Sequence, residues 1–241
     1  MTSESLLISN RFCGPPKSGN GGYVCGRLAA QIAGAASVRL KAPPPLEKEL
    51  RVEKTETSAQ LLDGSGVIAE ARAAALDLSP PRPPSFTEAD RATKSYLGFM
   101  RHPFPRCFVC GPQRAAGDGL RIFPGQLESG SLVAAPWIPD GSLTDGTNKV
   151  SSEFLWAALD CTSGFAVLPI PEDKAIVLGE LCARLDGDLE PNEKCVVIGW
   201  PLQIDGRKRL AGSAVFSSSG LPVAVGRATW IEVPNSAFGG L

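Results

Sequence analysis

Two stretches of the chain share one pattern, in which a loop of small and polar residues leads into an apolar helix and then into a series of strands. The first stretch covers residues 18–30, and the second covers residues 150–161, about 130 residues further on. That spacing is roughly the length of one ordinary domain and is typical of an internal duplication. The pattern therefore predicts two similar halves in this chain of 241 residues.

The two copies differ where chemistry would be expected. The first copy keeps the loop Asn20-Gly21-Gly22, and it has Ala29 or Ala30, depending on register, where the second has Asp160. The second copy keeps that acid but has Ser151-Ser152-Glu153 in place of the glycines. The duplication is therefore asymmetric, and the residues that differ are the first candidates for a functional site.

The composition is that of a folded protein with a substantial core. Hydrophobic residues make up 43% of the chain and charged residues 20%, which is typical of globular domains. The formal net charge of −1 and the absence of a basic stripe with interleaved aromatic residues predict that nucleic acid is not a partner. No segment reaches the roughly 18 apolar residues of a membrane span, and the N-terminus lacks the basic region of a signal peptide. Seven cysteines scattered through apolar runs indicate reduced thiols, so we expect a cytoplasmic protein.

Local patterns predict the secondary structure. In the first half we expect a weak edge strand at 4–9, a loop at 15–22, a helix at 23–36 and strands at 37–41, 50–56, 59–62 and 66–74. In the second half we expect strands at 119–123 and 131–137, a helix at 151–167 and strands at 175–185, 194–204, 209–217 and 223–233. Between the halves, residues 79–84 form a stiff proline-rich linker, followed by a short helix at 88–100. Hairpin signals at Asp63-Gly64, Asp205-Gly206 and Ser219-Gly220 join consecutive strands.

Antiparallel strands joined by hairpins, with one helix inserted early in each half, describe an α+β fold. We expect an N-terminal repeat at 1–77, a proline-rich linker with a short helix at 78–105, and a C-terminal repeat at 106–241. Each helix should lie across the concave face of a curled sheet.

Several motifs resemble those of a known family. Residues 107–112, Cys-Phe-Val-Cys-Gly-Pro, followed by residues 117–123, are similar to the Cys-Phe-x-Cys-Gly opening of the phenylacetate-type acyl-CoA thioesterases. Leu159-Asp160 with Gly164 resembles the Leu-Asp-x-x-x-Gly helix of that family. In the first half, the match consists of Phe12 with Gly14, the loop at 20–22 and the strand start at 38–40. The resemblance to hotdog-fold thioesterases covers most of the chain except the linker.

The resemblance implies a double hotdog, with two curled antiparallel sheets that each wrap around one central helix. The sheets would be joined edge to edge, with the helices antiparallel. It also implies a hydrolase that acts on an acyl-CoA or acyl-carrier thioester, with the acyl chain between the two helices and the pantetheine arm along the seam of the halves. In this family the loop of one half faces the acid of the other, so one composite site is expected, formed by Asn20, Gly21, Gly22 and Asp160.

These four residue types suit thioester hydrolysis. A backbone N–H at a helix start, aided by the helix dipole, can stabilise a developing oxyanion, and glycine lets the backbone approach the ligand closely. Asn20 would supply a side-chain amide. Asp160 would act as general base or nucleophile, and apolar neighbours would raise its pKa. For substrate contacts we expect Tyr23, Trp156, which could line an acyl tunnel, and Glu153.

Each candidate also has a plain structural interpretation. The loop at 20–22 could be a helix turn with Asn20 as its cap, and Asp160 could be satisfied by Thr162 and Ser163. Glu153 could be a first-turn acid favoured by the helix dipole, and Trp156 could belong to the core.

The Cys107-x-x-Cys110 pair could be half a zinc site with His102. Because the sequence shows no fourth donor, packed thiols are favoured and no metal is expected. His102 is the only histidine and lies in a proline-flanked loop. It would therefore have to be recruited from the linker for a dehydratase or a Ser-His-Asp hydrolase.

The expected function is thus a thioesterase-like hydrolase without cofactors. The alternative is a non-catalytic protein that binds an acyl thioester or lipid through a degenerate site, and a purely structural role is a third possibility. Because the long C-terminal strands would offer free edges, we also expect a homo-oligomer of double-hotdog chains.

Overall fold

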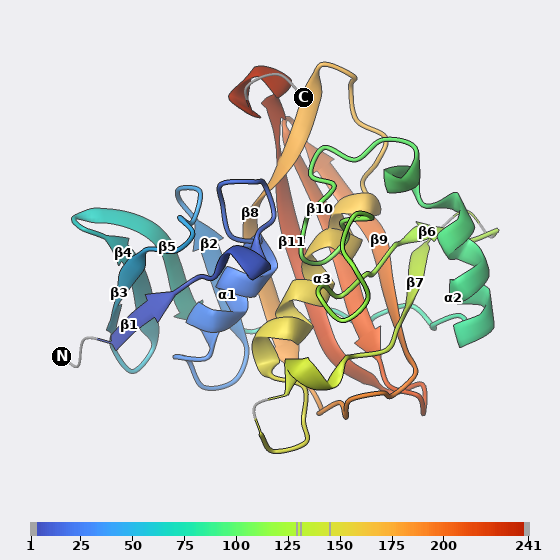
Figure 1. Ribbon diagram of the computed structural model, residues 1–241, viewed down its shortest axis with the longest axis horizontal. Helices are drawn as coiled ribbons and strands as arrows, with labels where there is room; N and C mark the ends of the chain where they lie inside the picture. Colours follow the sequence, from blue (N-terminus) through green and yellow to red (C-terminus); the bar gives the residue numbers. More distant parts are fainter. Residues whose placement is uncertain (1–3, 129, 131, 145, 239–241) are drawn as a thin grey trace.

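A computed structural model of the protein describes residues 4–128, 130, 132–144 and 146–238. Within these residues, eleven strands form one antiparallel sheet in the order β1-β3-β4-β5-β2-β8-β11-β10-β9-β7-β6 (Figure 1). The first-half strands are β1 (Glu4–Leu7), β2 (Ala36–Leu40), β3 (Glu49–Lys54), β4 (Ser58–Asp63) and β5 (Gly66–Ala73). The second-half strands are β6 (Gly125–Gln126), β7 (Val133–Trp137), β8 (Lys174–Leu185), β9 (Cys195–Asp205), β10 (Lys208–Phe216) and β11 (Pro222–Pro234).

The two halves meet at the pairing of β2 with β8, where Val38 lies opposite Leu181 in antiparallel register. The two sheets that were expected to join edge to edge are one continuous sheet, because the ladder runs through this seam without interruption. The long strands β8 to β11 all lie inside the sheet, and its edges are the short strands β1 and β6. Parts of the long strands are still paired on one side only, because in the described residues β7 pairs with β9 only at Cys195–Gly199 and β2 pairs with β8 only at Glu180–Ala183. These open stretches agree with the expected free edges, and the oligomeric state remains a prediction.

The two main helices, α1 (Gly21–Ala29) and α3 (Ser152–Phe165), lie side by side on the same face of the sheet (Figure 1). Gly22 meets α3 near residues 156–160 and Gly26 meets it near 153–156, so the helices run antiparallel. The apolar faces of the helices pack on the sheet. Fully buried side chains at this contact include Leu28 of α1, Leu159 of α3 and Leu181 of β8. Each such side chain contributes roughly 1.5–3 kcal/mol by its removal from water.

The helix expected at 23–36 begins two residues earlier and ends at Ala29. Gly34 has a φ of +76°, a left-handed conformation that no α-helix contains, and residues from Ala36 onward pair with β5 and β8. The strand expected at 119–123 is also wrong. The backbone of Leu120 and Ile122 bonds to the loop at residues 108–109, and Arg121 has a φ of 53° that breaks an extended chain.

The linker carries a helix in a different place from the one expected at 88–100. Helix α2 (Phe86–Ala92) begins after Ser85, whose side chain and Glu88 form a reciprocal capping box. The chain then tightens into short 3₁₀ turns at Thr93–Ser95 and Leu97–Phe99. Ala89 of helix α2 belongs to a second apolar cluster, together with Ile198 and Trp200 of β9. The strand expected at 131–137 corresponds to β7, which begins at Val133. Residue Ser131 lies outside the described residues.

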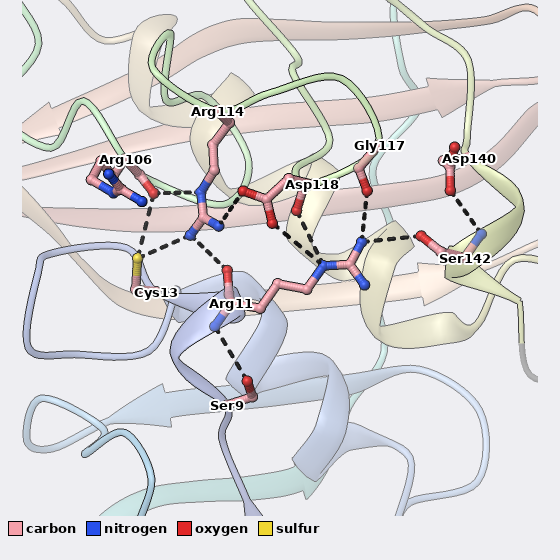
Figure 2. A network of polar contacts seen from close by, with 9 residues as sticks. All are labelled: Ser9, Arg11, Cys13, Arg106, Arg114, Gly117, Asp118, Asp140 and Ser142. Carbon is pink, nitrogen blue, oxygen red and sulfur yellow. Dashed lines mark hydrogen bonds and ion pairs between the residues drawn. The ribbon is translucent and has the colours of Figure 1, made fainter.

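The loop that follows the linker is bound to the N-terminal segment by two arginines (Figure 2). Buried Arg114 donates to the backbone oxygens of Arg106 and Arg11 and forms an ion pair with Asp118. Arg11 in turn donates to the backbone oxygens of Asp118 and Gly117. This network joins residues about 100 positions apart in the chain and holds the loop of Cys107 and Cys110 next to the start of α1.

Candidate functional site

Helix α1 starts at Asn20 because its side chain caps the first turn. The Asn20 Oδ1 accepts a hydrogen bond from the Tyr23 N–H at 2.9 Å, while the Asn20 backbone stays extended. This leaves the Asn20 Nδ2 free to donate away from its own helix. The N–H of Gly21, the first helical residue, makes no hydrogen bond to any described residue.

Asp160, in the other half of the chain, accepts hydrogen bonds from the free donors at the start of α1. The Gly22 N–H donates to the Asp160 Oδ2 at 2.8 Å, and the Asn20 Nδ2 donates to the same oxygen at 3.0 Å. Three of the four residues expected in a composite site are therefore joined by hydrogen bonds between α1 and α3. Both donors hold the carboxylate in this structure, whereas the sequence analysis assigned them to a thioester oxygen.

The carboxylate is buried, with Asp160 2% exposed and Asn20 3% exposed. Burial raises the pKa of Asp160 to about 7, against the opposing effect of the hydrogen bonds from Gly22 and Asn20. The second carboxylate oxygen, Oδ1, is buried and has no hydrogen-bond partner among the described residues. An unpartnered buried oxygen costs free energy, so this atom is a candidate for contact with a ligand or a water molecule.

The plain structural interpretation, in which Thr162 and Ser163 hydrogen-bond to the Asp160 carboxylate, is wrong. The Thr162 hydroxyl donates to the backbone oxygen of Ala158. The Ser163 hydroxyl donates to the backbone oxygen of Asp160 and accepts from the Trp230 indole N–H. Neither hydroxyl contacts the carboxylate, so the acid is held entirely by the opposite helix.

Two glycines allow the helices to touch. A Cβ placed on Gly22 would lie 2.4 Å from the Asp160 Cβ, and one on Gly26 would lie 2.6 Å from the Glu153 Cα. No side chain fits at either position without moving α3. The expected acyl-chain path between the helices is therefore closed at this point. A Cβ on Gly21 would instead lie nearest to the side chains of Leu178, at 2.9 Å, and Leu40, at 3.2 Å, at the seam between β8 and β2.

The three residues expected to contact substrate are placed differently from one another. Tyr23 is 2% exposed, stacks on Phe12 with ring centroids 4.2 Å apart, and accepts a hydrogen bond from Arg27. Trp156 is 3% exposed and packs against α1 at Gly26. Both side chains belong to the core in this structure, and neither lines a described surface depression. Glu153 is half-buried and does line one.

That depression, of about 560 Å³, lies at the start of α3, at the position that mirrors the start of α1. It is lined by the loop at 149–153 together with Leu155 and residues 185–188. Ser151 caps α3 without a side-chain hydrogen bond. The mirror position thus has space but no glycine pair and no facing acid.

Sequence reasoning missed one cluster beside the site. The sulfur atoms of Cys107, Cys110 and Cys161 all lie within 4.8 Å of one another, and the Asn20 Nδ2 lies 3.9 and 3.8 Å from the Cys107 and Cys161 sulfurs. Cys161 is on α3, directly after Asp160, and nothing local in the sequence associates it with a loop fifty residues earlier. The only available signal was that a Cys-x-x-Cys pair needs further donors.

Comparisons with solved structures place the fold. The chain aligns with a candidate thioesterase II from Thermobifida fusca at a TM-score of 0.61 and 12% identity, covering 97% of this chain and 93% of that one. An acyl-CoA thioesterase II, TesB2, from Mycobacterium marinum aligns at a TM-score of 0.57 and 12% identity, covering 98% and 94%. A conserved protein with a hot dog fold from Alicyclobacillus acidocaldarius aligns at 0.53 and 10% identity, covering 96% and 93%. No family model and no curated protein sequence matches the chain.

The protein therefore has a hotdog fold that extends over nearly the whole chain, and the recognition of that fold from the motifs is confirmed. At these identities the likeness shows the fold alone. Within the described residues, no helix combines the length and the apolar character needed to cross a membrane.

Proposed function

We propose that the protein hydrolyses an acyl-CoA or acyl-carrier thioester at one composite site, where the start of α1 meets Asp160. The observation that carries this proposal is the set of contacts between the halves, in which the Gly22 N–H and the Asn20 amide hold one carboxylate oxygen. The other oxygen and the Gly21 N–H stay unpartnered among the described residues. The thioesterases with which the chain shares its fold agree with this assignment.

The free groups divide the work of hydrolysis between them. The Gly21 N–H, at the positive end of the α1 dipole, would donate to the thioester oxygen as negative charge develops on it. One such donor supplies about 3–4 kcal/mol in acyl transfer. Because Gly21 faces Leu40 and Leu178, the acyl chain would approach along the seam of β2 and β8.

Asp160 would supply the second function through its Oδ1. As a base, it takes a proton from water while the water oxygen adds to the carbonyl carbon; the C–S bond then breaks and the thiol leaves with the proton. As a nucleophile, it forms a mixed anhydride as the thiolate leaves, and water then cleaves this intermediate to the free acid. Asn20 and Gly22 position the carboxylate in both routes because they fix its Oδ2.

One observation favours a second candidate, a protein that binds an acyl thioester or lipid without cleaving it. The carboxylate is almost completely buried, and it already occupies two of the three donors at this helix start. A site closed in this way would hold a ligand at its rim without reaching the reacting carbon.

Hydrolysis of a panel of acyl-CoA thioesters by the wild type and by Asp160→Asn separates these candidates. The substitution keeps the shape of the side chain and should lower the rate by about 10²–10⁴-fold, as expected for a positioned acid or base. Asp90→Asn, which changes an exposed acid on α2, is the matched control and should keep the full rate. A wild type that binds the panel but turns nothing over would support the binding protein, and full activity in Asp160→Asn would overturn the catalytic assignment.

A further inference from the structure

Three buried thiols from two distant segments converge beside Asp160. Cys107 and Cys110 lie in the loop after the linker, and Cys161 lies on α3. The Cys107 and Cys161 sulfurs are 3.8 Å apart, and the three sulfurs form a group within 4.8 Å. All three are free thiols in this structure. The other four cysteines of the chain do not join this group.

The loop itself is built to present sulfur atoms on one side. Cys107 and Cys110 are separated by two residues, and the Gly111 N–H closes the turn on the Cys107 carbonyl oxygen at 2.9 Å. A Cβ on Gly111 would lie 2.5 Å from that oxygen, so only glycine fits there. Cysteine binds metal as the thiolate, and this turn places two such sulfur atoms within 4.8 Å of each other.

The spacing of the sulfurs fits a tetrahedral metal better than a disulfide. With zinc–sulfur bonds of about 2.3 Å, two thiolates of a tetrahedral site lie roughly 3.8 Å apart, which is the distance between Cys107 and Cys161. A disulfide needs its sulfurs about 2.05 Å apart. The Asn20 amide, 3.8–3.9 Å from both sulfurs, lies where an outer hydrogen-bond donor to metal-bound thiolates is expected.

The imidazole of His102 is a candidate fourth ligand. The His102 Nε2 lies 3.3 Å from the Cys110 sulfur, and the side chain is partly buried against the same loop. The His102 Nδ1 accepts a hydrogen bond from the Phe104 N–H. Zinc held through Nε2 would need the imidazole proton on Nδ1, so the ring would have to turn away from the Phe104 N–H to bring Nε2 near all three sulfurs.

We propose that Cys107, Cys110 and Cys161 bind one zinc ion as thiolates, with the His102 Nε2 as the fourth ligand. The site is closed and buried, so its role is structural. It fastens the loop after the linker to α3 at the residue next to Asp160, and thereby holds the two parts of the composite site together. Sequence reasoning expected no metal because the third cysteine is contributed by the distant helix.

Metal analysis of the full-length protein, expressed without added chelator, tests this proposal. We expect about one zinc per chain in the wild type and a loss of most of it in Cys107→Ala, Cys110→Ala and Cys161→Ala. Cys182→Ala and Cys195→Ala remove buried thiols outside the cluster and should keep the zinc. His102→Ala should weaken binding by more than the ~10–100-fold that follows from loss of an outer-shell partner.

Cobalt substitution of the wild type gives a second readout that does not depend on how the variants fold. Cobalt(II) added to chelator-treated protein should produce the sulfur-to-cobalt charge-transfer and visible bands of a tetrahedral thiolate site, and zinc should abolish them. A wild type that contains no zinc and gives no such bands would overturn the site. So would a Cys107–Cys161 or Cys107–Cys110 disulfide found by mass spectrometry of the alkylated protein. Unchanged binding in His102→Ala would overturn the fourth ligand.

Discussion

The starts of α1 and α3 occupy equivalent places in the two halves, yet they differ in almost every chemical respect. At the start of α1, Asn20 caps the helix, Gly22 touches the opposite helix, and the two donate to a facing carboxylate. At the start of α3, Ser151 makes no capping bond, and the helix opens on a surface depression. One helix start has the functional groups and little space, and the other has space without the groups.

The difference concentrates the chemical groups of the two halves at one helix start. In a symmetric pair each helix start would need a glycine pair and each helix a facing acid. Here the glycines remain only in the first half and the acid only in the second, so the contacts between Asn20, Gly22 and Asp160 occur once. The mirror position therefore has no facing buried carboxylate, which would carry a desolvation cost of its own.

A large difference in stability should come from placing alanine in the first turn of each helix. Gly22→Ala places a carbon within 2.4 Å of the Asp160 Cβ and 2.7 Å of the Trp156 backbone oxygen, so the helices must separate. We expect the free energy of unfolding to fall by at least the ~1–3 kcal/mol typical of overpacking. Ser152→Ala, in the first turn of α3, removes only a hydroxyl and should stay within about 0.5 kcal/mol. Equal effects in chemical denaturation would contradict the inequality of the two helix starts.

Removal of the two capping side chains should give a contrast of comparable size. Asn20→Ala abolishes a cap worth about 1 kcal/mol and a hydrogen bond to a carboxylate worth about 1.5–3 kcal/mol. Ser151 makes no capping hydrogen bond, so Ser151→Ala should change the unfolding free energy by no more than about 0.5 kcal/mol. Thermal unfolding of the two variants measures both changes in stability. A loss of stability in Ser151→Ala as large as that in Asn20→Ala would contradict the difference between the two helix starts.

The smallest effect concerns the first-turn acid of α3. Glu153→Gln removes a favourable interaction with the helix dipole, which is worth about 0.3–1 kcal/mol at low ionic strength and is screened by salt. We expect a small loss of stability that shrinks further when salt is added. An effect above about 2 kcal/mol, unaltered by salt, would mean that Glu153 does more than favour its own helix.

Much of the fold could be predicted from local patterns. The hairpin signals placed β4 to β5 and β9 to β11 within one or two residues, because a glycine turn and period-two alternation act over a few residues. Helix α1 was expected to be longer, since its alanine-rich sequence continues beyond Ala29 and the pairing of β2 with β8 overrides helix propensity. The strand expected at 119–123 failed for a similar reason, because that backbone bonds to the cysteine loop.

The site could be predicted only where the duplication made it visible. Asn20, Gly22 and Asp160 stand out because the same position in the other copy is different, and the structure brings the three together. Gly21 and its unpartnered N–H could not be separated from Gly22 without the geometry of the helix start. Cys161 was not visible as a partner of Cys107, because that contact spans 54 residues and depends on how α3 packs on the loop.

The number of ligand sites per chain tests the central claim most directly. Calorimetric titration with an acyl-CoA analogue, in which a methylene group replaces the thioester sulfur, measures this number whether or not the protein cleaves thioesters. One equivalent per chain is expected, with binding lost in Gly21→Val, because a Cβ there already lies 2.9 Å from the Leu178 side chain and 3.2 Å from that of Leu40, so the added side chain displaces both. Two equivalents per chain, or one that persists in Gly21→Val, would contradict a single site at the start of α1.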